Sequence, residues 1–211
     1  LYPDPGSLVL VGDRGVGLSL DRITGDAAYP NLRDLAEGAS SVDRLAAFRS
    51  VSLALSGRGV ARRLPGQAVD AGFFQVLGLP LRLGRAFTPE DQRPGAPPVA
   101  VLSQALWRQD FGADPGLLGS TVELDGVPHR VVGVAPGVTV PRNPQVWVPL
   151  TLDPRLAEAR NRRQVVALAR LVPGATLASA RAEAVRVFEG LARDHPEVGD
   201  GRSVGLLPVR R

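Results

Sequence analysis

The sequence QVVALARLVPGATLASARAEAVRVFEGLARD, from residue 164 onward, decides the predicted fold of this chain. Residues 164–172 are apolar enough for a buried strand, and Pro173-Gly174 is typical of a turn. In residues 176–194 apolar side chains recur every three to four positions, which indicates a helix packed on a sheet. These side chains are Leu177, Ala180, Ala184, Val187, Phe188 and Leu191. A strand at 204–209 would complete a β-α-β unit.

The N-terminal part of the chain shows the same order of elements. Residues 7–11 form a short apolar run that predicts a buried strand. Residues 29–38 predict a short helix, with Pro30 near its start and Gly38 just after its expected end. Residues 42–55 are apolar at imperfect intervals of two, which favours extended structure.

The two ends together predict an α+β fold with two lobes. A split β-α-β, ferredoxin-like (porter-like) lobe would be formed by residues 1–62 plus 152–211. Residues 63–151 would form a smaller α/β lobe inserted between them. Two pairs of a strand and a short helix are predicted in the insertion: 67–70 with 72–77, and 98–102 with 104–111. Asp125-Gly126, between apolar residues, predicts a β-hairpin, because both residues tolerate positive φ.

The insertion also carries a series of short motifs whose order and spacing are more specific than any one of them. The blocks are FFQVLG (73–78), GRAFTPED (84–91), VAVLS (99–103) leading into LWR (106–108), FGADP (111–115), LGSTVELDG (118–126), VVGVAP (131–136) and VWVPL (146–150). Together they resemble the MacB-like periplasmic core domain, a family found in FtsX-type ABC permeases. The resemblance extends to LVPGAT (171–176) and His195-Pro196. The segment 56–60 is most similar to the duplicated orphan permeases of that family.

The resemblance implies a domain that performs no chemistry. Such a domain projects from the periplasmic (extracytoplasmic) face of the bacterial inner membrane, tethered by flanking transmembrane helices. A nucleotide-binding ATPase subunit or domain would hydrolyse ATP in the cytoplasm, and the lobes would open or close in response. Hinges are expected where the chain crosses between lobes, near residues 63 and 151. A periplasmic adaptor or a second permease copy is a further implied partner.

No catalytic, cofactor-binding or metal-binding residue is expected from this resemblance. The residues of the motif blocks are expected to have structural roles. They are Phe74, Leu77, Gly78, Gly84, Arg85, Phe87, Trp107, Phe111, Gly112, Gly119, Gly126, Gly133, Val134, Trp147 and Pro149.

Composition excludes several enzyme classes. The chain has 211 residues, 44% of them hydrophobic, which suffices for a buried core. It has no cysteine and all 25 basic residues are arginine, which excludes disulfides, thiolate metal sites and catalytic lysines. A net charge of +4, with acidic residues interleaved among scattered basic pairs, argues against nucleic-acid binding. No run reaches the roughly 18 apolar residues of a membrane span, and the absence of methionine suggests a fragment of a longer protein.

Several possible sites have simpler explanations. The loop GDRGVG at 12–17 departs from the GxGxxG spacing of a phosphate-binding loop. The two histidines, His129 and His195, occur without a GxSxG motif, which makes a hydrolase a distant third hypothesis. Glu90, Asp91 and Asp110 could act as paired carboxylates, but the first two also suit the first turn of a helix capped by the preceding threonine.

Two further features concern tryptophan and arginine. Trp107 and Trp147 could form a ligand-stacking patch, but their apolar neighbours favour core packing. Arg85 could join the two lobes through a carboxylate, because guanidinium binds carboxylates with two hydrogen bonds. The second functional hypothesis is a free-standing periplasmic ligand- or protein-binding module, which would need a cleft with convergent polar groups.

Overall fold

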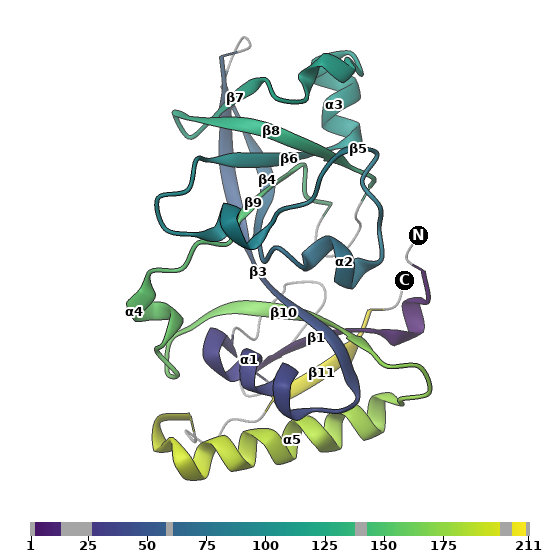
Figure 1. Ribbon diagram of the computed structural model, residues 1–211, viewed down its shortest axis with the longest axis vertical. Helices are drawn as coiled ribbons and strands as arrows, with labels where there is room; N and C mark the ends of the chain where they lie inside the picture. The colour runs from purple at the N-terminus through teal and green to yellow at the C-terminus, as the bar shows by residue number, and fades with distance from the viewer. Residues whose placement is uncertain (1–2, 14–26, 58–60, 138–142, 199–203, 210–211) are drawn as a thin grey trace. The chain divides into compact units, whose positions relative to one another are not determined.

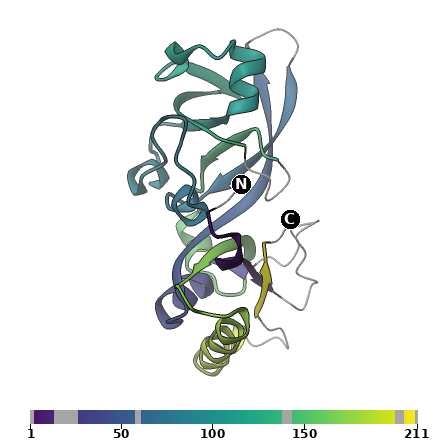
Figure 2. The same cartoon turned by 90° about the vertical axis from the view of Figure 1, so that its right-hand side faces the viewer.

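The computed structural model divides into two compact units. It describes residues 3–13, 27–57, 61–137, 143–198 and 204–209 (Figures 1 and 2). Unit 1 consists of Leu1–Phe48 and Leu152–Arg211, and unit 2 consists of Arg49–Thr151. Each unit is described by itself below. The loop 12–17 lies largely outside the described residues.

Unit 1 is built on an antiparallel sheet in the order β11-β1-β10-β3. Its strands are β1 (Leu8–Asp13), β3 (Val42–Ser56), β10 (Arg163–Leu171) and β11 (Val204–Pro208), and the short β2 (Ala27–Ala28) pairs with the start of β10. Helix α1 (Tyr29–Gly38) connects β1 to β3 by way of β2, and α5 (Leu177–Asp194) connects β10 to β11. This β-α-β-β-α-β order confirms the predicted split ferredoxin-like lobe of an α+β fold.

The two helices of unit 1 lie on the same face of its sheet (Figure 1). Helix α1 buries Leu32 and Leu35, and α5 buries Ala180 and Ala184. The buried face of α5 is therefore the one predicted from apolar side chains spaced three and four residues apart. The remaining short elements of the unit are η1 (Pro5–Ser7), α4 (Pro154–Ala157) and η5 (Pro196–Val198).

Unit 2 contains a sheet that closes into a ring of six strands. The ring runs from the end of β3 through β4, β9, β6, β8 and β7, which pairs with β3 again. The strands are β4 (Arg62–Val69), β6 (Val99–Ser103), β7 (Thr121–Leu124), β8 (Val127–Ala135) and β9 (Val146–Pro149), with β5 (Leu83–Gly84) beside β8. Closure leaves these strands few free edges.

The core of unit 2 is formed by the ring strands and one helix. Leu102 and Leu124 are buried strand residues of this core, and α3 (Gln104–Phe111) adds Leu106 and Phe111. Ser103 begins α3 because its Oγ accepts a hydrogen bond of 3.1 Å from the amide of Leu106. The other elements are α2 (Phe73–Leu77), η3 (Pro89–Gln92) and η4 (Pro115–Leu117).

The first boundary between the units lies inside β3, between Phe48 and Arg49. The sequence predicts it later, between residues 62 and 63. The reason is that β3 is one continuous strand whose two parts have different partners. Phe48 pairs with Val166 of β10, whereas Leu55 pairs with Leu124 of β7. Apolar spacing along the strand cannot show where its pairing partner changes.

The structure confirms the predicted hairpin. Asp125 and Gly126 connect β7 to β8 with φ values of 49° and 78°. The turn is also attached to β3, because the amide of Ala54 donates to Asp125 Oδ1 at 2.8 Å and the amide of Asp125 donates to the carbonyl of Ala54 at 2.8 Å.

Candidate functional site

Aromatic motif residues meet in the interior of unit 2. Trp147 is fully buried, and its ring lies 5.5 Å from that of Phe74 in an edge-to-face arrangement. The ring of Phe87 lies 6.3 Å from that of Phe74. The indole Nε1 of Trp147 donates a 3.0 Å hydrogen bond to the buried Oε1 of Gln67. Trp147 is therefore a core residue and not part of a ligand-stacking patch.

Trp107 lies apart from this aromatic cluster, on α3. It is half-buried against the core to which Phe111 belongs, and its Nε1 donates to the carbonyl of Asp114 at 2.9 Å. Leu77 and Val134 are also fully buried, whereas Pro149 is half-buried at the end of β9. The structure thus does not gather the motif residues into one pocket.

The glycines of the motifs lie at positions where a side chain would strain or clash. Gly84 of β5 pairs with Gly133 of β8, and a Cβ on Gly84 would lie 2.1 Å from the carbonyl oxygen of Val132. A Cβ on Gly133 would lie 2.6 Å from the carbonyl oxygen of Arg85. The remaining motif glycines have positive φ and end helices or form turns: Gly78, Gly112, Gly119 and Gly126.

Arg85 finds its carboxylate inside unit 2, which corrects the prediction that it joins the two lobes. Its NH1 and NH2 donate to the two oxygens of Asp91 at 2.6 and 3.1 Å, and NH1 also donates to the carbonyl of Ala86. Asp91 Oδ2 accepts the amide of Thr88 at 2.8 Å, as expected for a capped turn. Arg85 and Asp91 are six residues apart in the sequence, so they can pair locally. This local pair competes with any carboxylate farther away for the guanidinium of Arg85.

This pair also affects ionisation. Hydrogen bonds from Arg85 lower the pKa of the Asp91 carboxyl, while partial burial opposes that shift. The same hydrogen bond raises the pKa of Arg85. Both groups therefore remain charged over the neutral range, and the pair has a structural use in holding β5 against η3.

The other acidic residues and the histidines considered as catalytic candidates have separate partners. Asp110 forms an ion pair with Arg62, and Glu90 lies 3.7 Å from Arg93. The Nδ1 of His129 contacts the carbonyl oxygen of Val127 at 2.8 Å, and that of His195 lies 3.7 Å from Glu197. Within the described residues, no three His, Cys, Asp or Glu side chains gather as metal ligands.

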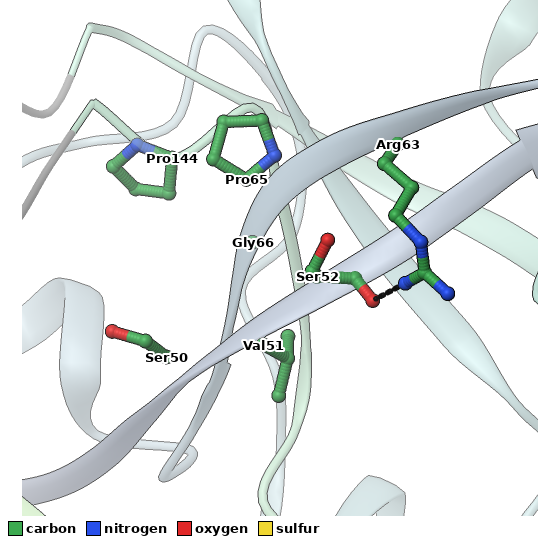
Figure 3. Close-up of a pocket in the computed structure, with 7 residues that line it drawn as sticks. All are labelled: Ser50, Val51, Ser52, Arg63, Pro65, Gly66 and Pro144. Atoms are coloured by element: carbon green, nitrogen blue, oxygen red, sulfur yellow. Dashed lines mark hydrogen bonds between the residues drawn. The ribbon is translucent and has the colours of Figure 1, made fainter.

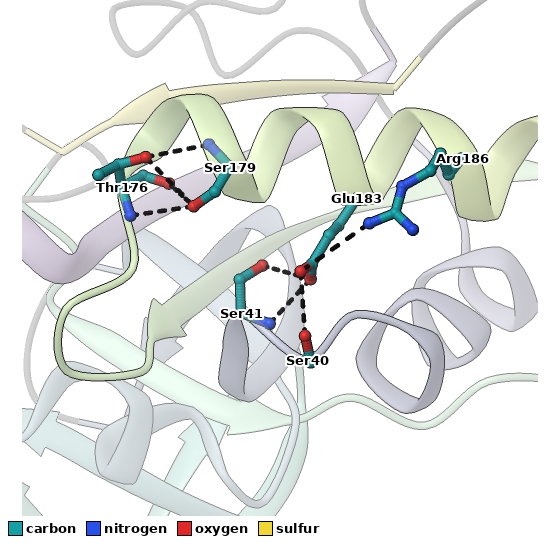
Figure 4. Close-up of polar contacts among 6 residues, drawn as sticks. All are labelled: Ser40, Ser41, Thr176, Ser179, Glu183 and Arg186. Carbon is teal, nitrogen blue, oxygen red and sulfur yellow. Dashed lines mark hydrogen bonds and ion pairs between the residues drawn. The ribbon is translucent and has the colours of Figure 1, made fainter.

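A polar cluster in unit 1 was not predicted from the sequence. Glu183 of α5 accepts hydrogen bonds from the amide and hydroxyl of Ser41, both at 2.8 Å, and from the hydroxyl of Ser40 at 3.0 Å (Figure 4). These bonds lower the pKa of Glu183, the backbone amide contributing most. They hold the middle of α5 to the corner between α1 and β3. The partners are separated by more than 140 positions in the sequence, so no local pattern indicates them.

The start of α5 has a recognisable signal. Thr176 Oγ1 accepts the amide of Ser179 at 3.1 Å, and the Ser179 hydroxyl accepts the amide of Thr176 at 3.1 Å (Figure 4). This reciprocal pair is a capping box with serine in its last position. It fixes the helix start predicted at residue 176.

Unit 2 also contains a surface crevice with a volume of about 480 Å³, within the range of small-molecule sites. Ser50, Val51 and Ser52 of β3 line it, together with Arg63, Pro65, Gly66 and Pro144 (Figure 3). The NH1 of Arg63 in β4 donates to the carbonyl of Ser52 in β3 at 3.0 Å, which fixes the guanidinium beside β3. The sequence analysis did not identify the crevice, because it forms where two strands lie side by side.

The chain resembles known transporter proteins in sequence. The sequence profile of the MacB-like periplasmic core domain matches residues 4–187. The Macrolide export ATP-binding/permease protein MacB of Burkholderia thailandensis is 37% identical over 116 residues, which is 52% of this chain and 17% of that protein. The protein of the same name from Burkholderia pseudomallei (strain K96243) is 35% identical over 114 residues, with the same coverage. The chain spans a small part of these relatives.

Solved structures share the fold. The periplasmic region of MacB from Actinobacillus actinomycetemcomitans matches with a TM-score of 0.68 at 18% identity, over 96% of this chain and 88% of that chain. A domain of a putative permease from Porphyromonas gingivalis matches with a TM-score of 0.73 at 15% identity, over 100% and 94%. The extracellular domain of the noncanonic ABC-type transporter YknZ from Gram-positive bacteria has a TM-score of 0.65 at 15% identity, over 95% and 99%.

Among the described helices, none combines the length and apolar character that crossing a membrane requires. The family assignment rests on the profile match, which covers most of the chain, and the structural neighbours agree with it in fold. The chain belongs to the MacB-like periplasmic core domain family.

Proposed function

We propose that this chain is the extracytoplasmic domain of an ABC transporter permease in the bacterial inner membrane and that it couples ATP hydrolysis in the cytoplasm to movement outside. The match of the family profile to residues 4–187 is the observation that carries the proposal. The domain would perform no chemistry itself. Its partners would be flanking transmembrane helices and a nucleotide-binding ATPase, with an adaptor or second permease copy as a further partner.

The two-unit organisation supports a mechanical role. Each unit has its own packed sheet and helices, and closely packed interiors transmit displacement. The chain passes between units twice, within β3 at Phe48–Arg49 and at Thr151–Leu152. We place the hinges at these crossings, so that the first lies near residue 49 and not near 63. The motif residues would keep unit 2 rigid during the movement.

The sequence of the native gene on both sides of this segment is the first test. The proposal expects a stretch of about 20 apolar codons before residue 1 and another after residue 211, since a membrane helix needs that length. A signal peptide upstream and a stop codon downstream would instead identify a secreted module and overturn the proposal.

The second test measures movement in the membrane-embedded transporter. The chain has no cysteine, so Glu37→Cys in α1 and Gln109→Cys in α3, both exposed, can carry a fluorophore pair that reports across the units. We expect the transfer efficiency to change when ATP or a trapped transition-state analogue is added. Glu37→Cys with Glu189→Cys in α5 is the matched control within unit 1, and its efficiency should stay constant. Unchanged efficiency of the first pair in an ATP-hydrolysing transporter would contradict the coupling role.

A periplasmic binding module is the second candidate function, and the crevice along β3 is the observation that favours it. A module of this kind would be stabilised by its ligand in proportion to the logarithm of ligand concentration. A purely mechanical domain would show no rise in melting temperature with small molecules.

A further inference from the structure

We propose that the crevice of unit 2 is a binding site for small organic anions that carry a carboxylate or a phosphate ester next to a short apolar group. The site is formed by Arg63, Ser50 and Ser52 as the polar side and by Pro65 and Pro144 as the apolar side. This inference rests on the binding function that the crevice favours and names its ligand class; failure of the titration described below would leave the mechanical role standing.

Arg63 brings a positive charge to this crevice, without an acidic partner among the described residues. Neighbouring Arg62 forms an ion pair with Asp110, and Arg85 forms one with Asp91. Across the described part of the chain, Arg63 has no carboxylate within ion-pair distance, and its one hydrogen bond goes to the carbonyl of Ser52. That bond occupies NH1 and orients the planar group, so NH2 and Nε can donate to an anion.

Two hydroxyl groups lie on the same strand as this carbonyl. Ser50 and Ser52 are two residues apart on β3, and their side chains therefore point to the same face of the strand. Over the described ranges, neither hydroxyl makes a hydrogen bond within the protein. A hydroxyl can donate to a carboxylate or phosphate oxygen, so each serine offers a donor on the polar side of the crevice, as Arg63 does.

The apolar side of the crevice sets the shape of the ligand. Pro65 and Pro144 lie close together across from the serines of β3, as Figure 3 shows. Gly66 brings β4 close to β9, since a Cβ there would lie 2.9 Å from Val146 Cγ1. The prolines are therefore held in place by strand packing. Their rings offer apolar surface for a few methylene groups but no hydrogen-bond donor.

The experiment is a titration followed by NMR chemical shifts of backbone amides, using short alkyl probes that carry a carboxylate, a phosphate or an ammonium head group. n-Butyrate, n-butyl phosphate and n-butylammonium are each added to the 211-residue chain. We expect saturable shifts at Ser50, Val51, Ser52 and Gly66 with one or both anions, at dissociation constants of about 1 mM. The ammonium probe should cause none. Saturation by butyrate alone or by butyl phosphate alone supports the site and identifies its head group.

The matched variants are Arg63→Gln and Arg62→Gln, which remove the same charge from adjacent residues. Arg63→Gln should weaken binding at least about tenfold, equivalent to 1.4 kcal/mol, whereas Arg62→Gln should change it less than about twofold. Thermal melting of both variants checks that they fold. Absence of saturable shifts in the wild-type chain, equal shifts with the cation, or equal weakening by the two variants would overturn the proposal.

Discussion

Gly84 and Gly133 show how single residues allow β5 and β8 to approach. Gly84→Ala should destabilise unit 2 in two ways: its φ of +71° disfavours a side chain, and the new Cβ would overlap the carbonyl of Val132. Gly95→Ala isolates the first effect, because Gly95 has a φ of +82° and nothing within 4 Å. We expect a loss of about 1 kcal/mol for Gly95→Ala and about 1–3 kcal/mol more for Gly84→Ala, measured by urea denaturation. Equal losses would show that β5 moves away without penalty.

Asp91 gives a prediction about pH at the same scale. Its native pKa lies below the ordinary value of 3.8, so between the two values the unfolded chain binds more protons and stability rises with pH. The contribution of Asp91 is thus complete above the ordinary pKa and is lost as pH falls through the native one. Asp91→Asn should therefore unfold with a weaker pH dependence in acid. Glu189→Gln, which removes a carboxylate from the exposed face of α5, should retain the wild-type dependence; identical curves for all three proteins would contradict the prediction.

At the scale of elements, β11 ends the strand order of unit 1, and an unpaired edge can attract another chain. Arg181 of α5 protects this edge, because its Nε and NH2 donate to the carbonyl of Leu206 at 3.1 and 2.8 Å. Pro208 adds a residue without an N–H group.

Removing this protection should promote self-association. Arg181→Ala should form dimers or larger species as concentration rises, while Arg186→Ala, which removes the same charge from the same helix, should not. Analytical ultracentrifugation over a concentration series distinguishes the two. If both variants sediment like the wild type, the guanidinium is not what protects β11.

The whole molecule has two cores that share a strand. Leu168→Ala in unit 1 and Leu102→Ala in unit 2 each remove a fully buried side chain, at a cost of about 2–5 kcal/mol. Hydrogen exchange should accelerate in β1, β10 and β11 for the first variant and in β6, β8 and β9 for the second, because each unit packs mainly on itself. Amides of β3 should respond to both. Uniform acceleration throughout the chain would show a single cooperative unit instead.

The sequence by itself determined what depends on neighbouring residues. The spacing of Leu177, Ala180 and Ala184 predicts the buried face of α5, and Asp125-Gly126 predicts the hairpin. The order of the motif blocks identified the family that the profile later matched. Periodicity and turn conformation are local properties, so they can be read from a single chain.

The tertiary structure alone decided which distant segments meet. The pairing of Leu55 with Leu124 closes the ring of unit 2, Glu183 binds Ser41, and Arg63 is left beside two serines without an acid partner. Asp91 lies close to Arg85 in the sequence, but the sequence alone does not show which carboxylate pairs with Arg85. These contacts depend on the register of strands and on packing over long separations, and no spacing of residue types specifies them in advance.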